Sequence, residues 1–120
     1  MIPVTLNVPV NMWEYSYDID NNYYYVTFNM PEILNGVLKD GAVNVYYIEK
    51  NGAQAAMPAV RHREDIDPVT GEKYLYTVTL DYEYDLGTLT IFYTASDFVY
   101  EQAPEFGPDR DMAFRCVVMY

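Results

Sequence analysis

Hydrophobic and polar residues alternate along most of this chain, most clearly over residues 74–84. Tyr, Leu and Val occupy every second position from Tyr74 to Tyr84, while Thr, Asp and Glu occupy most of the positions between them. A period of two places the two sets on opposite faces of a β-strand, so this segment is predicted to be half buried and half solvated. Such a strand is typical of an antiparallel sheet, because parallel sheets are buried on both faces.

The same alternation predicts strands at residues 4–10, 13–17, 23–29, 42–50, 88–94 and 112–120. The first of these is expected at a sheet edge, because Pro3 and Pro9 cannot donate to a hydrogen-bond ladder. Residues 54–66 begin with poor β formers and Pro58, so they are expected to form an irregular edge.

Turn residues separate these strands. Asn51-Gly52 predicts a hairpin with positive φ at both positions, and Asp85-Leu86-Gly87 predicts a second hairpin. Residues 18–22 and 67–71 also read as turns. Residues 30–38 are the one place for a helical turn, with Pro31 in its first turn, and residues 97–111 form a long loop.

About seven or eight short strands with at most one short helical turn indicate an all-β fold. We therefore predict a single antiparallel β-sandwich of the Ig-like or Greek-key type, with a closed barrel as the alternative. The long loop would carry the chain between sheets. The 120 residues contain no repeat or linker, so residues 1–120 are expected to form one domain.

Charge narrows the classes of partner. The net charge is −11, from 18 acidic against 7 basic residues, and this disfavours nucleic acids and anionic lipid surfaces. No run of about twenty apolar residues is present, so direct membrane insertion is not expected. The first residues lack the pattern of a signal peptide, but a processed chain would look the same. The single cysteine, Cys116, is expected to be a buried, inert thiol.

Two groups of acidic residues in predicted turns are candidate metal sites. Asp18, Asp20 and Asn22 have the spacing that begins an EF-hand loop, but Tyr23 and Asn29 replace the glycine and glutamate that such a loop requires. A second group surrounds Gly71 and consists of Asp65, Asp67 and Glu72. Solvated turns explain both groups, so neither a metal nor a cofactor is predicted.

The only histidine lies in the basic segment Arg61-His62-Arg63. A hydrolase would need His62 to meet a carboxylate and a nucleophile, yet the chain has no serine elbow and only two serines, Ser16 and Ser96. We therefore expect ion pairs or a contact patch here.

The carboxylates of Asp81 and Glu83 share one strand face, as a glycosidase pair would. Threonines on the neighbouring strand indicate an ordinary solvated face instead. No enzyme is predicted.

Aromatic residues are the strongest remaining clue. Trp13, 14 tyrosines and 5 phenylalanines exceed what one sandwich core easily buries, so some rings should lie outside. Tyr24 and Tyr46 differ in parity from their neighbouring tyrosines, and with Trp13 they are the candidate ligand-binding residues. The alternative is cross-strand pairing that only stabilises the sheet.

Several segments together resemble a known family. They are Trp13, Tyr-Tyr-Tyr-Val-Thr-Phe at 23–28, Met-Pro-Glu-Ile at 30–33, Gly-Ala-Val at 41–43, Met-Pro at 57–58, Tyr-Thr-Ala-Ser-Asp at 93–97 and Phe-Arg-Cys-Val-Val-Met-Tyr at 114–120. From Trp13 to Tyr120 the chain resembles the small exported, often lipid-anchored β-sandwich proteins of Bacteroidetes, most of which have no characterised function. The resemblance implies a cell-envelope or secreted location and no catalytic residue. That family usually carries a leader and a lipidated cysteine ahead of the domain, whereas this sequence starts at Met1 and its sole cysteine lies near the other end, so either the leader is missing or this member differs.

We therefore expect a non-catalytic envelope or secreted module that binds a protein partner through a strand edge or an aromatic face. A carbohydrate-binding module is the alternative. The two differ in geometry, because a glycan site needs exposed rings that are coplanar or stepped, whereas a protein site is a broader patch with an apolar centre.

Overall fold

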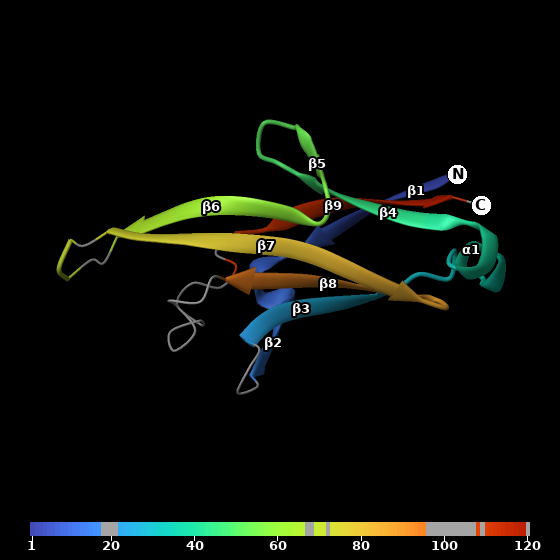
Figure 1. Cartoon of the computed structure of the whole chain (residues 1–120), viewed down its shortest axis with the longest axis horizontal. Coiled ribbons are helices and arrows are strands. Elements are labelled where there is room, and N and C mark those ends of the chain that lie inside the picture. Colours follow the sequence, from blue (N-terminus) through green and yellow to red (C-terminus); the bar gives the residue numbers. More distant parts are fainter. Residues whose placement is uncertain (18–21, 67–68, 72, 96–107, 109, 120) are drawn as a thin grey trace.

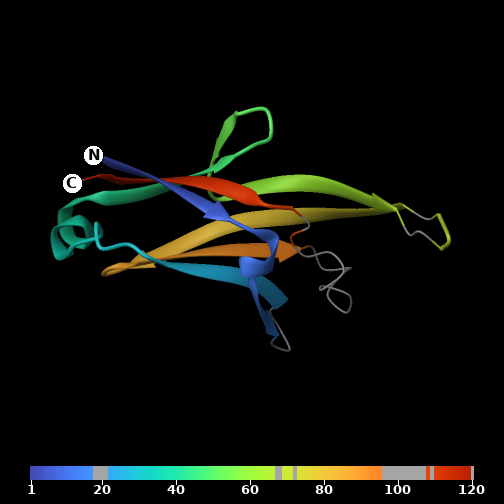
Figure 2. The ribbon, with the colours of Figure 1, turned by 180° about the vertical axis from the view of Figure 1, so that it is seen from behind.

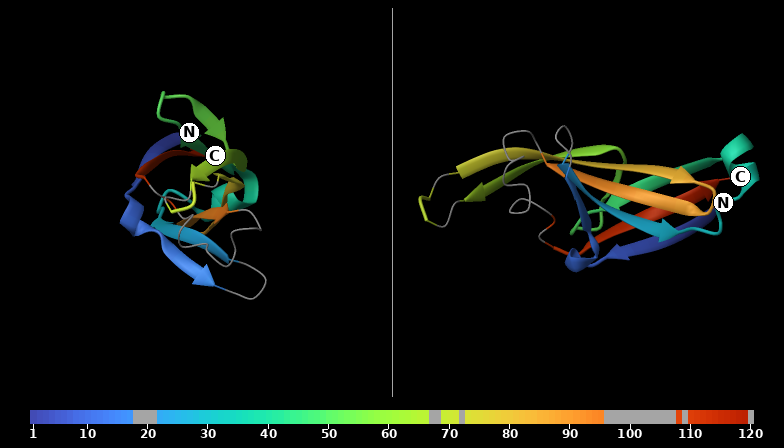
Figure 3. Two further views of the ribbon diagram at one scale, coloured as in Figure 1. Left: turned by 90° about the vertical axis from the view of Figure 1, so that its left-hand side faces the viewer. Right: turned by 90° about the horizontal axis from the view of Figure 1, so that it is seen from below.

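The computed structural model describes residues 1–17, 22–66, 69–71, 73–95, 108 and 110–119, which form two antiparallel sheets packed face to face (Figure 1, Figure 3). The four-stranded sheet has the order β1 (Ile2–Val8), β9 (Met112–Met119), β4 (Ala42–Ile48) and β5 (Gln54–Ala56). The five-stranded sheet has the order β2 (Glu14–Tyr17), β3 (Asn22–Asn29), β8 (Thr88–Ala95), β7 (Lys73–Asp85) and β6 (Ala59–Ile66). The predicted all-β sandwich is confirmed.

Strands that are distant in sequence pair at the centre of each sheet. Strand β9 lies between β1 and β4, and β3 lies beside β8. The pairing of Ile2 with Val118 places the start of β1 against the end of β9, at the end of the molecule that carries α1 (Figure 1, Figure 2). The strand at residues 4–10 was expected at an edge, and β1 is an edge strand.

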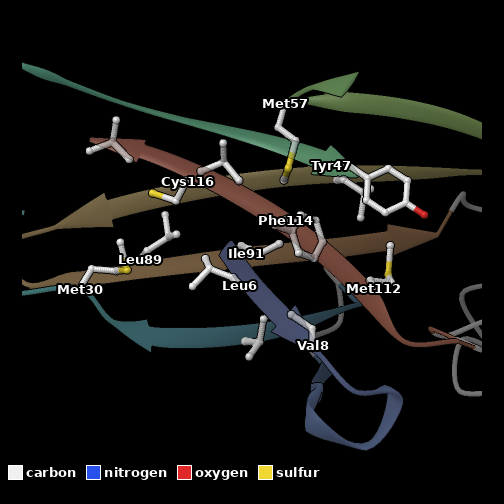
Figure 4. Packing of buried hydrophobic residues seen from close by; sticks show 14 of the residues in the cluster. Leu6, Val8, Met30, Tyr47, Met57, Leu89, Ile91, Met112, Phe114 and Cys116 are labelled. Carbon is white, nitrogen blue, oxygen red and sulfur yellow. The ribbon is translucent and has the colours of Figure 1, made fainter. Parts of the chain in front are cut away.

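One core fills the space between the sheets (Figure 4). Leu89 and Ile91 from β8 and Phe114 and Cys116 from β9 are completely buried. They alternate with less buried residues along each strand, because successive side chains of a strand point to opposite faces. Burial of apolar surface on this scale is the main force that holds the two sheets together.

The inner and outer faces of β7 agree with the predicted alternation. Val78 and Leu80 are buried, and Tyr76 and Tyr82 pack against the core. The intervening Asp81 and other polar residues lie on the outer face. Tyr84 continues the inner set but is 37% exposed. The hairpin of β6 and β7 extends beyond the strands that cover it (Figure 1, Figure 3).

The predicted number of seven or eight strands is wrong, because the described residues form nine strands. The expected irregular edge at 54–66 is two strands, β5 and β6, which belong to different sheets. The chain crosses between the sheets at Met57-Pro58, where the peptide bond is cis. Proline lacks the N–H of a ladder residue, which suits this break between strands.

The helical segments also differ from the prediction. Helix α1 spans Asn35–Asp40, so it begins later than the expected segment at 30–38, and Pro31 lies in the preceding turn. There the N–H of Ile33 donates to the carbonyl of Met30, which ends β3 before the helix starts. A short 3-10 turn, η1 (Val10–Met12), was not predicted and separates β1 from β2.

The predicted reversal at Asn51-Gly52 is confirmed, but its turn type is not. Only Gly52 has a positive φ, of 88°. The N–H of Gly52 donates to the carbonyl of Glu49, and the N–H of Glu49 donates to the carbonyl of Ala53. This is a type I turn followed by a glycine bulge, the next most common hairpin connection after the two-residue turns.

Candidate functional site

Three aromatic rings gather on the outer face of the five-stranded sheet. Tyr23 and Tyr25 of β3 and Phe92 of β8 are half-buried, whereas Val26 and Ile91 beside them point into the core. The ring centroids of Tyr23 and Phe92 are 5.5 Å apart at an interplanar angle of 75°. Those of Tyr23 and Tyr25 are 6.0 Å apart at 58°. We call these three residues the aromatic face.

A carboxylate flanks the aromatic face on each side. Tyr25 pairs with Glu14 of β2 and with Phe92 of β8, and Phe92 pairs with Asp81 of β7. Residues directly opposite in antiparallel strands share a face, so these four side chains form one row across four strands. Glu14 and Asp81 are both exposed. The row therefore has an aromatic centre and an acidic end at each side.

The next rows are polar. The hydroxyl oxygens of Thr27 and Thr90 are 3.1 Å apart and share a hydrogen bond. Thr90 also pairs with Glu83. A shallow hollow of about 250 Å³ follows and is lined by Glu83, Tyr84, Asp85, Thr88 and Thr90. The threonines and carboxylates predicted to form a solvated face thus form the polar border of the aromatic face.

The structure does not bring the predicted ligand-binding residues together. Trp13 is only 9% exposed and packs edge to face against Tyr93 and Phe114, so the expectation of an outward indole is wrong. Tyr24 lies on the inner side of β3 and packs against the core, with its ring centroid 4.9 Å from that of Tyr15. The alternation alone left open which of Tyr23 and Tyr24 points inward, and the structure shows that Tyr24 does.

Tyr46 does face outward, but it lies on the other sheet. It is partly exposed, and the guanidinium carbon of Arg115 lies 5.5 Å from its ring centroid. This position is a cation–π contact within the sheet. No further aromatic ring contact of Tyr46 occurs among the described residues.

Sequence reasoning missed the aromatic face because it named Tyr24 as a candidate and left open which tyrosines of β3 face outward. Tyr24 shares its parity with Val26 and Phe28, and these apolar neighbours indicate the buried set. Tyr23 and Tyr25 share theirs with Thr27, which indicates the outer set. The signal was present in the chain, but the pairing with Phe92 and the two carboxylates depends on strand order.

Two tyrosines on β7 form a second aromatic feature. The rings of Tyr82 and Tyr84 are nearly parallel, at 19°, with centroids 6.4 Å apart. The hydroxyl of Tyr82 donates to the carbonyl of Val43 at 2.9 Å, which fixes this ring against the four-stranded sheet. Burial, and then the neighbouring Tyr84, raise the pKa of Tyr82 above its ordinary value.

The core also shifts the pKa of two further groups. The predicted burial of Cys116 is confirmed, and burial raises the pKa of its thiol to about 11, which disfavours the thiolate. Burial, followed by the effect of Tyr15, raises the pKa of Tyr24. These shifts belong to the packed interior and not to the aromatic face.

The predicted acidic turns lie largely outside the described residues. This holds for Asp18, Asp20, Asp67 and Glu72, while Asn22 begins β3. In the described part of the chain, no cluster of three or more histidine, cysteine, aspartate or glutamate side chains is arranged to hold a metal ion.

His62 lies in a shallow cleft between the end of β4 and the edge strand β6. The cleft holds about 280 Å³ and is lined by Tyr47, Glu49, Lys50, Arg61, His62, Arg63 and Arg110. None of these described lining residues is a serine, threonine or cysteine. The nearest residue in the register of β6 with β7 is Thr77, which lies directly opposite His62. We call these residues the basic cleft.

Comparison with known proteins leaves the site to be interpreted from its own geometry. No helix of the described residues has the length and apolar character needed to cross a membrane. No protein-family model, curated protein or solved structure matches this chain.

Proposed function

We propose that this protein is a non-catalytic module that binds a basic segment of a protein partner on the aromatic face. The observation that carries the proposal is the row of Glu14, Tyr25, Phe92 and Asp81 across four strands. Aromatic side chains at the centre of a patch and polar groups at its rim are the common anatomy of a protein interface. The resemblance to exported β-sandwich proteins supports a location at the cell envelope or outside the cell.

The carboxylates at both ends of the row favour a partner with basic side chains. An arginine or lysine side chain lying over Tyr25 and Phe92 would make cation–π contacts and reach a carboxylate at either end. Asp81 already accepts the backbone N–H of Tyr82 through one oxygen, at 2.7 Å. Its other oxygen is available to a cation. The net charge of −11 would also speed the approach of a basic partner.

Ring geometry favours a protein over a polysaccharide at this face. The Tyr23 ring is tilted by 58° from Tyr25 and by 75° from Phe92. A glycan platform needs rings that are parallel or stepped, whereas tilted rings give an uneven apolar surface on which side chains can pack.

Carbohydrate binding is the second candidate, at another place. Tyr84 is nearly parallel to Tyr82, is 37% exposed and borders the polar hollow of Glu83, Asp85, Thr88 and Thr90. One accessible ring beside carboxylates and hydroxyls can stack on a single sugar and hydrogen-bond to it.

Selection from a displayed library of random peptides tests the main proposal. Clones that bind the folded domain should be enriched in Arg and Lys, and synthetic copies should bind less tightly as salt rises. The double change Glu14→Gln with Asp81→Asn should weaken binding about two- to thirtyfold, because each of the two exposed charge contacts contributes about 0.2–1 kcal/mol. Tyr25→Ser should weaken binding at least about twofold, because an exposed cation–π contact contributes about 0.5–1 kcal/mol.

Matched controls separate the face from general effects. Asp40→Asn removes an exposed carboxylate on α1, and Tyr46→Ser removes an outward ring from the other sheet. Both should bind like the wild type. Selected peptides without basic residues, or equal loss in the controls, would contradict the proposal. A glycan that raises the melting temperature of the wild type but not of Tyr84→Ser would support the second candidate instead.

A further inference from the structure

Positive charge is concentrated at one place in this acidic protein. Of 7 Lys and Arg residues in the chain, four line the basic cleft, and so does the only histidine. The cleft adjoins a second hollow of about 490 Å³ that shares Tyr47, Glu49, Lys50 and Arg110 with it. A net charge of −11 already favours solubility, so solubility does not explain why these basic residues lie close together.

Two arginines occupy positions that are core positions elsewhere in the sheet. Ala59, Arg61 and Arg63 alternate along the inner side of β6, opposite Leu80, Val78 and Tyr76 of β7. Ala59 is buried, but Arg61 and Arg63 are only half-buried, because β4 ends at Ile48 and no longer covers them. We call this end of the sandwich, where no described strand of the other sheet covers β6, the open end. Guanidinium groups line it in place of apolar side chains.

One of these cations, Arg61, forms an ion pair with an acid of the cleft. The Nε of Arg61 lies 2.9 Å from Oε1 of Glu49, and each side chain is 34% exposed. Glu49 is the only acid among the described residues that line the basic cleft. No ion pair of Lys50 or Arg63 is formed with any of the described residues. In the adjoining hollow, Asp111 accepts the N–H of Val10 at 3.0 Å. Among the described lining residues of the cleft, basic side chains outnumber acidic ones.

The chemistry of these side chains points to an oxyanion. A guanidinium presents N–H donors in a planar fork that matches a carboxylate or phosphate, and a lysine adds a mobile point charge. Arg61 is held in place by two contacts, because its Nε donates to Glu49 and its Nη1 donates to the carbonyl of Val60 at 3.1 Å. Tyr47, which also lines the cleft, belongs to the buried core, and its hydroxyl points away from the other labelled core residues (Figure 4).

We propose that the basic cleft binds the carboxylate or phosphate group of an anionic ligand, with Arg63 and Lys50 as direct ligands. This site is separate from the aromatic face, which lies on the outer side of the same sheet and attracts cations. The competing explanation is that the arginine stems only cover the open end of the core while their charged groups remain in water. That explanation predicts no saturable anion binding.

Titration of the isotope-labelled full chain by NMR tests the proposal. Citrate is the carboxylate probe, pyrophosphate is the phosphate probe, and sodium chloride at equal ionic strength is the reference. Backbone amides of residues 49–50 and 61–63 should shift saturably with at least one probe and not with chloride. The probe that binds more tightly identifies the chemical class.

Matched variants assign the shift to the cleft. Arg63→Gln should weaken binding of the probe by at least about tenfold, and Lys50→Gln, at an exposed position, should weaken it severalfold. Lys39→Gln removes the same charge from an exposed position on α1 and should leave the affinity unchanged. If Arg63→Gln impairs folding, Lys50→Gln decides the matter.

The absence of a saturable shift with both probes would overturn the proposal. Equal weakening by Lys39→Gln and Lys50→Gln would overturn it as well, because binding would then follow net charge alone. Tyr25→Ser should bind the probe like the wild type, so failure of this proposal and failure of the aromatic-face proposal are distinguishable.

Discussion

At the scale of single residues, the side chain of Trp13 shows how burial overrides composition. A lone tryptophan in an aromatic-rich chain suggests a binding ring, but here it lies between Tyr93 and Phe114 in the core. Its indole N–H is buried without a hydrogen-bond partner among the described residues, which costs stability. Packing of the large ring outweighs this cost.

We therefore predict that Trp13 contributes to stability and not to binding. Trp13→Ala should lower the free energy of unfolding by about 3–5 kcal/mol, as expected for removal of a buried aromatic side chain, measured by urea unfolding with circular dichroism. Trp13→Phe should cost less, because it keeps part of the packing and removes the unpaired N–H. Tyr46→Ala, on the outer face, is the control and should cost about 1 kcal/mol or less. Equal losses in Trp13→Ala and Tyr46→Ala would contradict this assignment.

At the scale of elements, the junction between α1 and β4 depends on one close approach. Gly41 follows α1, its φ of −108° is accessible to any residue, and its N–H donates to the carbonyl of Val37. A Cβ atom at this position would collide with the backbone carbonyl oxygen of Met119 on β9. The glycine is therefore required by space and not by backbone conformation.

Gly41→Ala should destabilise the protein by about 1–3 kcal/mol, because the backbone of α1 or β9 must move to make room. The midpoint of urea unfolding measures this effect. Lys39→Ala, at an exposed position on the same helix, should change stability by no more than about 0.5 kcal/mol. A neutral Gly41→Ala would mean that the junction is looser than its contacts indicate.

Elements also differ in how well their residues predicted them. The alternation in β7 and β8 was sufficient because Val78, Leu80 and Leu89 are buried and each lies between polar neighbours. In the segment 54–66 the alternation was not sufficient to predict the strands. The chain changes sheet there, so β5 and β6 are both edge strands, where burial is slight and the hydrophobic period is weak. Helix α1 is short, and few residues specify its limits.

At the scale of the whole molecule, the buried titratable groups predict a response to alkaline pH. The pKa of Cys116 is raised from 9.0 to about 11, and those of Tyr24 and Tyr82 are raised above 10.0. The folded state therefore retains protons that the unfolded state releases. The stability that these groups contribute is fully present below about pH 9, and it is lost as the pH rises through their folded-state pKa values.

Urea unfolding at several pH values checks this expectation. The Cys116 thiol alone should lower the free energy of unfolding by about 2 kcal/mol between pH 8 and pH 11. Cys116→Ala should show a smaller decline over the same range, although it begins from a less stable protein. A wild-type stability that stays constant up to pH 11 would show that these groups ionise freely in the folded state.

The two proposed surfaces likewise belong to the whole molecule. Acidic side chains border the outer face of the five-stranded sheet, and basic ones line the open end of the sandwich. Residues far apart in sequence form both surfaces: Glu14 and Asp81 stand at the two ends of one row, and Lys50 and Arg110 line one cleft. Neither surface follows from a local motif.

Short stretches of sequence were enough to predict the fold class, the faces of β7 and β8, the two hairpins at Gly52 and Gly87, and the burial of Cys116. These features depend on local periodicity, turn residues and apolar neighbours, all of which are written into short stretches of chain. Only the tertiary structure decided which tyrosines face outward, that Trp13 is buried, and that the two carboxylates flank Tyr25 and Phe92. The physical reason is that strand order and the cover of one sheet by the other set burial and pairing, and these depend on contacts between distant parts of the chain.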